Sequence, residues 1–324
     1  MLVRFGYVAM SVNVANASPS KTMTATQFAK LADREAALRK LERIAEENIH
    51  NTLRLLKHNR AHDIHVFRFS SKLIPLLTHP ATEGWDPFPH LSPSFTELGD
   101  YAIKHAMRTS FHPDHFTVLT TPREEVLRAS LFDLSQQTRM LEAMGLDDRS
   151  KCNIHIGGTY GDKVTALARF RSRFPELPSA VRSRLTLEND DKTYTALETL
   201  QFAEELGVPM VLDLHHHQVN PGEGEPPEEL WPRVQRTWEG TSLPPKIHVS
   251  SPRSERDIRA HADYVEPAPL LHFLHSIAGF APQLDIMIEA KQKDAALFKL
   301  VDDLAREKGI RRIDGATLEV VRRI

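Results

Sequence analysis

The chain has 324 residues, and its 41 Lys and Arg residues against 43 Asp and Glu residues leave a formal net charge of −2. Hydrophobic residues make up 41% and charged residues 26% of the sequence, a balance that excludes a disordered or fibrous chain. No apolar run approaches the ~18 residues of a membrane span, the first residues lack the basic-then-apolar order of a signal peptide, and the single cysteine, Cys152, excludes a disulfide framework. We therefore expect a soluble intracellular protein.

Short apolar runs alternate with amphipathic segments along the chain. The runs predict eight strands of a buried parallel sheet, at residues 4–9, 64–69, 108–111, 153–156, 184–187, 210–212, 246–249 and 285–288. The segments between them predict helices, at residues 36–57, 122–144, 163–174, 193–206, 228–238, 267–279 and 292–308. Strand-then-helix repeats of this kind indicate an α/β protein, a single TIM (β/α)₈ barrel over residues 1–324.

Local signals mark the bounds of some of these elements. Thr121-Pro122-Arg123-Glu124 reads as a capping box with proline at the first helical position, and Gly145 marks the end of that helix. Residues 71–96, rich in Pro, His and Ser, and residues 220–227 are expected to be loops.

A histidine or an acidic residue lies at or near the end of six successive predicted strands: His112, His155, Glu188, Asp213, His248 and Glu289. In a barrel the carboxyl ends of the strands converge on one rim, where the active sites of TIM barrels lie. Crowded carboxylates would repel one another without a cation, and mixed imidazole and carboxylate ligands suit Zn²⁺ or Mn²⁺. The number of ligands suggests more than one ion, with Glu188 as a natural bridge.

Each of these residues also has a plain structural explanation, as a loop residue or a helix cap. Three consecutive histidines follow closely after Asp213, and strand alternation does not decide which of them points inward: His215, His216 and His217. The glycine-rich run at residues 157–161 could cradle a phosphate, although such a loop alone is a weak signal.

Longer motifs carry a more specific resemblance. In order along residues 4–293 they read RFGYV, ASPSKT, FRFSS, THP, RTSFHP, NIHIGGTYG, TLENDDKTYT, DLHHH, PKIHVSSP, AHADYV and MIEAKQKD. Together they resemble the ultraviolet-damage endonuclease family of bacteria and fungi. The resemblance implies a TIM barrel related to endonuclease IV that nicks DNA immediately 5′ of cyclobutane pyrimidine dimers, 6-4 photoproducts and abasic sites. Such a cut leaves a 3′-hydroxyl and a 5′-phosphate.

The same resemblance assigns metal ligands and catalytic residues. It adds His216 and His261 to the six strand-end ligands, and the choice of His216 follows the family's spacing of Asp and His. Lys246 matches a lysine that the family carboxylates beside the metals, and His79 matches a further active-site histidine. The expected catalytic residues are thus Glu188, Glu289, Lys246 and His79. The family prefers Mn²⁺; we expect up to three divalent ions, with Zn²⁺, Co²⁺ or Mg²⁺ as alternatives.

The chain departs from the family pattern where damage is recognised. Some relatives carry Gln-Tyr shortly after His-Pro, where this chain has His115 and Phe116. An aromatic ring at Phe116 can still wedge into a base stack, and burial as a packing residue is the alternative. Further contacts with DNA are expected from Tyr7, Tyr160, Lys163 and Lys291.

The expected partner is damaged double-stranded DNA, bound by a monomer that acts at the nucleoid in the cytoplasm. The near-zero net charge argues against a general basic field, but bound ions can supply local positive charge. Two alternatives stay open. One is a metal-dependent sugar isomerase or epimerase, which predicts a closed sugar-sized pocket, and the other is a sensor that binds lesions without cutting.

Overall fold

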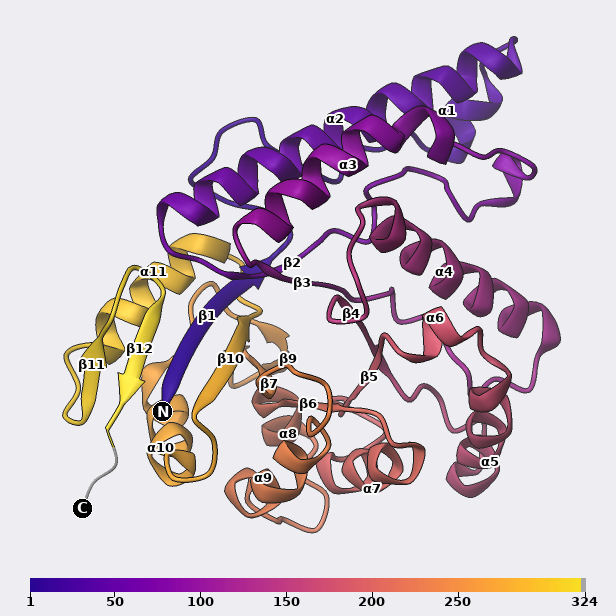
Figure 1. The fold of residues 1–324 in the computed structure, drawn as a ribbon. Coiled ribbons are helices and arrows are strands. Elements are labelled where there is room, and N and C mark those ends of the chain that lie inside the picture. The colour runs from indigo at the N-terminus through magenta and orange to yellow at the C-terminus, as the bar shows by residue number, and fades with distance from the viewer. Residues whose placement is uncertain (322–324) are drawn as a thin grey trace.

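The computed structural model describes residues 1–321, and eight parallel strands close into a barrel within a ring of helices (Figure 1). The barrel strands are β1 (Leu2–Val8), β2 (Val66–Arg68), β3 (Arg108–Phe111), β4 (Lys151–His155), β5 (Leu185–Glu188), β6 (Met210–Asp213), β7 (Lys246–Val249) and β10 (Gln283–Ile288). Each pairs with the next, and β10 pairs with β1 to close the barrel. The predicted TIM barrel is confirmed, and each predicted strand overlaps one of these eight.

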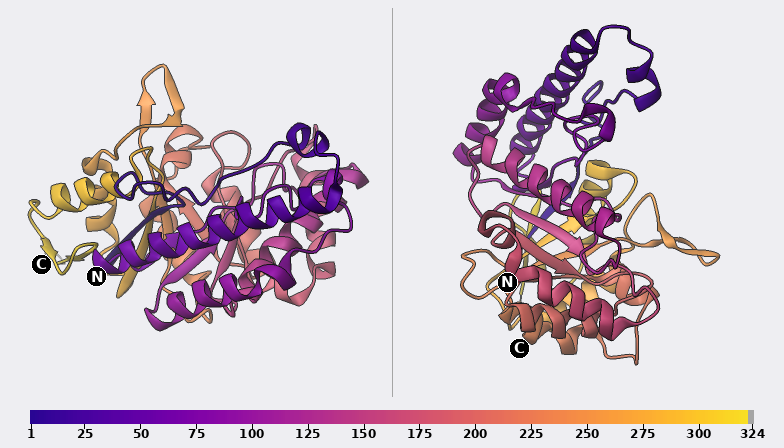
Figure 2. Two further views of the ribbon diagram at one scale, coloured as in Figure 1. Left: turned by 90° about the horizontal axis from the view of Figure 1, so that it is seen from above. Right: turned by 90° about the vertical axis from the view of Figure 1, so that its right-hand side faces the viewer.

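The helices follow the strands in the order expected for a barrel. They are α1 (Ala25–Ala29), α2 (Arg34–Ala61), α3 (Phe88–Lys104), α4 (Glu124–Ala143), α5 (Lys163–Arg173), α6 (Ser179–Arg182), α7 (Ala196–Leu206), α8 (Leu214–Val219), α9 (Pro227–Arg236), α10 (Pro267–Ile277) and α11 (Lys293–Leu304), with short 3₁₀ turns η1 (Pro80–Thr82) and η2 (Phe174–Glu176). The long helices α2 and α3 run side by side along one flank (Figures 1 and 2). Within the part of the chain that the structure describes, no helix is long and apolar enough to cross a membrane.

Two local predictions are wrong. The segment 71–96 is not one loop, because α3 begins at Phe88 and buries Leu91 and Phe95. The predicted capping box before α4 does not form either. Thr121 Oγ1 accepts the N–H of Arg123 at 3.2 Å, and the helix starts at Glu124 without a side-chain cap.

Two antiparallel pairs of strands add to the barrel. The pair β8 (Pro252–Ser254) and β9 (Asp257–His261) projects from the body of the molecule as a hairpin (orange in Figure 2). The pair β11 (Ile310–Arg312) and β12 (Thr317–Val320) extends the sheet beside β1. The amino group of Met1 donates to the carbonyl oxygen of Val320 at 2.9 Å, so the start of the chain is fixed next to β12.

The barrel interior is polar at several levels, unlike the apolar layers between strands and helices. Fully buried side chains such as Phe5, Leu212 and Ile286 belong to the hydrophobic core. By contrast, Lys246 and Asp285 are buried and ionisable. Burying a charge costs free energy unless the charge is paired, so these groups indicate where the barrel holds charged partners.

Candidate metal centre

The six strand-end residues lie at the C-terminal rim of the barrel. They come from β3 (His112, directly after it), β4 (His155), β5 (Glu188), β6 (Asp213), β7 (His248) and β10 (Glu289, directly after it). The strand register aligns His155 with Glu188, and Asp213 with His248. These side chains therefore lie at the same end of the barrel.

Two groups of these residues bring their ligand atoms within 4.8 Å of one another. One group is His112, His155 and Glu188, and the other is Glu188, Asp213, His248 and Glu289. Glu188 belongs to both groups and is buried. Because a carboxylate has two oxygens, this geometry fits two ions, one on each side of Glu188.

Imidazole rings contact both oxygens of the Glu188 carboxylate. His112 Nε2 lies 3.0 Å from Oε2, and His248 Nδ1 lies 3.0 Å from Oε1. His248 Nδ1 also lies 3.1 Å from Glu289 Oε1. Burial alone would raise the pKa of the Glu188 carboxyl, but the His248 and His155 imidazoles bring that pKa well below its usual range. Glu188 is therefore an anion and can bind a cation.

Three of the ligand residues each have one buried polar atom without a hydrogen-bond partner: His155 Nδ1, Asp213 Oδ2 and His248 Nε2. A buried polar atom without a partner costs about 1–3 kcal/mol, so three of them in one cluster indicate that another group satisfies them. Imidazole nitrogen and carboxylate oxygen together are a ligand set for Zn²⁺ or Mn²⁺. The residues of this rim fit a centre for divalent metal ions.

Neighbouring side chains hold the ligands in place. Asn153 donates an amide N–H to Glu188 Oε2, and Thr186 Oγ1 donates to Asn153 Oδ1 at 2.7 Å. Arg68 donates to Glu289 Oε1 at 2.6 Å. Outer partners of this kind fix the orientation of metal ligands. Sequence analysis missed Arg68 and Asn153, because nothing in their spacing distinguishes them from polar residues of the strands.

His216 is the one of the three consecutive histidines that faces the carboxylates. Its Nδ1 lies 3.5 Å from Glu188 Oε1 and 3.8 Å from Asp213 Oδ2. Burial opposes the charged form of His216, but the surrounding carboxylates raise its pKa to about 9. Both ring nitrogens of His215 are bonded to other parts of the protein, and His217 lines a different cavity.

The geometry gives less support to a third ion between His216 and His261. His261 is the last residue of β9 rather than a loop residue, and its Nδ1 lies 3.9 Å from Glu289 Oε2. The centroids of the His216 and His261 rings are 6.5 Å apart. Neither histidine belongs to the two groups with ligand atoms within 4.8 Å among the described residues.

The sequence pattern of the family described as UV-endonuclease UvdE matches residues 3–320. The chain belongs to this family. A UV DNA damage endonuclease from Halalkalibacterium halodurans is 47% identical over 320 residues, which cover 98% of this chain and 99% of the relative. The crystal structure of SacUVDE matches with a TM-score of 0.82 at 29% identity, over 93% of this chain and 98% of the other. Endonuclease IV from Thermus thermophilus shares the fold, with a TM-score of 0.55 at 14% identity over 94% of this chain and all (100%) of the other.

Membership of the UV-endonuclease family confirms the resemblance found in the sequence motifs. The chain is therefore an enzyme, an endonuclease. Membership also favours this interpretation over a sugar isomerase or epimerase, which would share the barrel and its rim of ligands but not the motifs along the chain.

Lys246 lies inside the barrel, two residues before His248 on β7, so both side chains point to the interior. Its Nζ lies 3.5 Å from Ser110 Oγ. Burial first, and then the nearby Arg108 and Arg68 guanidinium groups, lower the pKa of Lys246 to about 7. A substantial fraction of this amine is therefore neutral near neutral pH.

The prediction that Tyr7 contacts DNA is wrong. Tyr7 is 0% exposed, and its hydroxyl lies 2.7 Å from Asn59 Oδ1, to which it donates a hydrogen bond. The ring packs edge-on against Phe67 inside the molecule. The RFGYV motif therefore supplies a packing residue at this position, and no nucleic acid can reach its side chain.

Other residues expected to meet DNA are on the surface. Phe116 is 58% exposed and Tyr160 is 44% exposed, so burial as a packing residue does not describe Phe116. His115 and Lys291 are also exposed. Lys163 is half-exposed, but its Nζ lies 2.7 Å from Glu198 Oε1, and this ion pair competes with any phosphate.

Two cavities lie side by side above the rim. The first, of about 480 Å³, is lined by five of the expected ligands and by His115. The second, of about 420 Å³, is lined by His79 and Phe116. Asp114, Ser71 and Lys72 line both. His79 is thus not in contact with the ligand groups, and its Nδ1 accepts the N–H of Ala81.

Proposed function

We propose that the enzyme nicks duplex DNA immediately 5′ of cyclobutane pyrimidine dimers, 6-4 photoproducts and abasic sites, by metal-assisted hydrolysis. The products are a 3′-hydroxyl and a 5′-phosphate, and the preferred ion is Mn²⁺. The observation that carries this proposal is the sharing of Glu188 by two ligand groups at the rim. Family membership and the relatives named UV DNA damage endonuclease support the choice of substrate.

The two ligand groups support positions for two of the proposed ions. His112 and His155 with Glu188 would hold one ion, and Glu188 with Asp213, His248 and Glu289 would hold a second. His216 and His261 would hold a third. Divalent ions in such a site lower the pKa of bound water and neutralise the charge on the leaving oxygen.

The chain's own residues keep these ligands charged and oriented. Arg68, bonded to Glu289, and Asn153, bonded to Glu188, fix the two carboxylates that the reaction needs. Burial in the barrel excludes water from behind the carboxylates, which strengthens their attraction for cations. We also propose that Lys163 and Lys291 contact DNA phosphates, which position the duplex without reading its sequence.

We propose that Lys246 is carboxylated. The neutral amine would attack carbon dioxide, lose a proton and form a carbamate anion between the Arg68 and Arg108 guanidinium groups that lower its pKa. The signal of a carbamate in carbon-13 NMR, after incubation with labelled bicarbonate, tests this step. The signal should be absent in Lys246→Arg, and its absence from the native enzyme would refute the modification.

Lesion recognition would come from His115 and Phe116 beside the rim. A damaged duplex has lost part of its stacking, so it bends and opens at lower cost than an intact one. The exposed Phe116 ring can fill the gap between separated bases. His79 lines the same cavity as Phe116 and would contact the DNA there, rather than acting at the metals.

Incubation of the purified enzyme and Mn²⁺ with a duplex that carries one thymine dimer tests the proposal. We expect a single nick immediately 5′ of the dimer, with a 3′-hydroxyl that a polymerase can extend. The undamaged duplex of the same sequence is the control. Binding without a nick would support the lesion sensor instead. We further propose one domain over the whole chain, a monomer, and action on DNA in the cytoplasm.

A further inference from the structure

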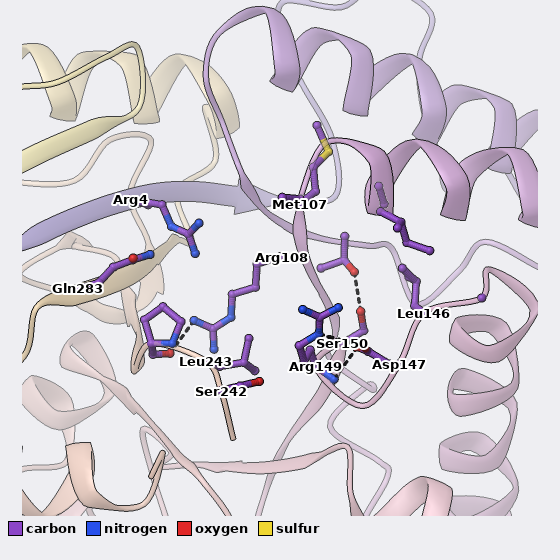
Figure 3. Close-up of a pocket in the computed structure, with 16 residues that line it drawn as sticks. Arg4, Met107, Arg108, Leu146, Asp147, Arg149, Ser150, Ser242, Leu243 and Gln283 are labelled. Atoms are coloured by element: carbon purple, nitrogen blue, oxygen red, sulfur yellow. Dashed lines mark hydrogen bonds and ion pairs between the residues drawn. The ribbon is translucent and has the colours of Figure 1, made fainter. Parts of the chain in front are cut away.

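A cavity of about 530 Å³ lies at the N-terminal end of the barrel, opposite the metal centre (Figure 3). The starts of β1, β3 and β10 supply Arg4, Arg108 and Gln283 to its wall. The loop before β4 supplies Arg149, and the end of α3 supplies an apolar side that includes Ile103. Of these residues only Arg108 has a part in the proposed function, through its charge beside Lys246.

The buried carboxylate of Asp285 accepts hydrogen bonds from two guanidinium groups at this end of the barrel. Arg4 donates to both oxygens of Asp285, at 2.8 and 2.6 Å, and Arg108 Nη1 donates to the same carboxylate at 2.7 Å. Gln283 Nε2 also donates to Asp285 Oδ1, at 3.2 Å. Two positive charges therefore meet one negative charge, and the acceptor oxygens of Asp285 are already occupied.

Arg108 is left with an unsatisfied group. Its side chain is 6% exposed, and its Nη2 has no hydrogen-bond partner. The Trp238 ring centroid lies 4.9 Å from Arg108 Cζ, but this contact with the face of the guanidinium does not replace a hydrogen bond. Arg108 keeps Asp285 as its ion partner, so the missing bond is that of one buried N–H, which costs about 1–3 kcal/mol. The Arg4 and Arg108 guanidinium groups still share one carboxylate, which leaves a deficit of negative charge at this end of the barrel.

Two more buried cations enlarge the deficit. Lys151 Nζ donates to the carbonyl oxygen of Ser183, and Arg184 donates to the carbonyl oxygens of Leu146 and Ser150. These partners are dipoles, not charges, and Arg184 Nε has no partner at all. The surrounding cations thus attract an anion, and burial weakens the screening of that attraction by water.

Arg149 can turn toward such an anion. In Figure 3 Arg149 lies apart from Arg4 and Arg108, which both bond Asp285. Arg149 pairs with Asp147, the one carboxylate among the residues described as lining the cavity, and both side chains are more than half exposed. An exposed pair of this kind is worth little and can open.

We propose that this cavity binds a small oxyanion, inorganic phosphate or a phosphomonoester. Guanidinium groups match the paired oxygens of phosphate through parallel hydrogen bonds. The cavity is larger than phosphate alone, and its apolar side by α3 leaves room for the organic part of a phosphomonoester. The metal ligands lie at the opposite rim, so phosphate at this site would not need the metal ions.

Calorimetric titration of the full chain with inorganic phosphate tests the site. The enzyme is first stripped of metal with EDTA, so that phosphate cannot bind through ions. We expect saturable binding of one phosphate per chain. Ile103→Glu places a negative charge at the cavity without touching a buried ion pair, and it should weaken binding at least tenfold. Arg149→Ala should weaken it severalfold.

Matched variants separate the site from general charge effects. Ile313→Glu changes another exposed isoleucine (47%, against 55% for Ile103) away from the cavity, and Arg306→Ala removes an exposed arginine paired with Asp303. Both should bind phosphate as the native chain does, and so should Glu188→Gln at the metal centre. Absence of saturable binding, unchanged binding in Ile103→Glu, or loss of binding in Glu188→Gln would each overturn the proposal. None of these outcomes bears on nicking.

Discussion

Glu188 receives contacts from side chains on several elements of the barrel. His112 follows β3, Asn153 lies on β4, His248 lies on β7, and His216 belongs to α8. Because these partners surround one buried carboxylate, no other acidic side chain can take its place without moving a strand. The consequence of losing its charge is therefore local and severe.

Glu188→Gln should remove nicking and leave the fold intact. Glutamine keeps the volume of the side chain, but the amide lacks the charge that would hold two ions. Loss of an outer partner of a metal ligand costs about 10–100-fold, so loss of a shared ligand should lower the nicking rate at least about 100-fold. Glu289→Gln should behave likewise. Glu125→Gln, at an exposed acid of α4, is the control. Native nicking together with native metal content in both variants would disprove the assignment.

Phe116→Ala should weaken binding of the damaged duplex. Base–aromatic stacking is worth roughly 1–3 kcal/mol per base, and the exposed ring has few packing contacts to lose, so thermal stability should not change. Fluorescence anisotropy with a lesion duplex and with the intact duplex measures the preference. Phe132→Ala removes another exposed phenylalanine, on the outer face of α4, as a matched control. A fall in thermal stability together with an unchanged preference for the damaged duplex would contradict the role of Phe116 as a wedge between bases.

Single residues also show which parts of the site the sequence pattern can predict and which it cannot. The six strand-end ligands could be predicted because a strand's end fixes the rim on which its last side chain lies. The choice among His215, His216 and His217 could not, because α8 begins there and helical rotation, not strand alternation, sets their directions. Family spacing selected His216 instead. Tyr7 was misassigned because a motif shows that a position matters without showing whether it is buried.

At the scale of elements, signals were strong where apolar residues face the core. Every barrel strand buries apolar residues, such as Phe111 on β3 and Ile247 and Val249 on β7. The hairpin of β8 and β9 escaped prediction because it is largely exposed and carries no apolar pattern. Helix α3 did carry an apolar pattern, because Leu91, Phe95, Leu98 and Ala102 recur at helical spacing. Prolines near its start and inside it, at Pro93, obscured that signal.

Asp294 joins three elements near the metal rim. Its carboxylate accepts the Val12 N–H at 2.9 Å and the Asn13 amide at 3.0 Å, and it also bonds Ser11. His58, on α2, contacts the same carboxylate at 3.0 Å. Asp294 itself is the second residue of α11, so this one side chain ties the loop after β1 to two helices.

Asp294→Asn should destabilise the fold in a pH-dependent way. Burial raises the pKa of Asp294, but the hydrogen bonds from His58 and Ser11 outweigh it and lower the pKa from 3.8 to about 2. The carboxylate therefore stabilises the fold fully above pH 4 to 5, by about 2 kcal/mol. This contribution fades as the pH falls from 3.8 toward 2. Urea unfolding at pH 7 and at pH 3 measures it, with Asp302→Asn on the same helix as control. An equal loss at both pH values would contradict this account.

The whole molecule combines a slightly negative net charge with a rim whose ligands would bind metal cations. The charge of −2 gives no general attraction for DNA. Carboxylates and imidazoles at the rim supply the ligand set, and bound ions would reverse the sign of the local field. Binding of DNA would therefore depend on metal and on local lysine and arginine contacts together.

Nicking should vanish with EDTA, return with Mn²⁺, and fall steeply with added salt. Metal removal takes away both the catalytic ions and the positive field at the rim. Salt acts on the remaining contacts, since each phosphate neutralised by a cationic side chain adds about 0.9 to the slope of log affinity against log salt. Binding is measured by anisotropy with Ca²⁺ in place of Mn²⁺, on damaged and intact duplexes from low to high salt. Lys291→Ala should remove one phosphate contact and so lower that slope by about 0.9. Lys30→Ala, on the N-terminal segment, should leave the slope unchanged. Full nicking by rigorously metal-free enzyme, or affinity that ignores salt, would rule out a metal-dependent nuclease that holds DNA by its phosphates.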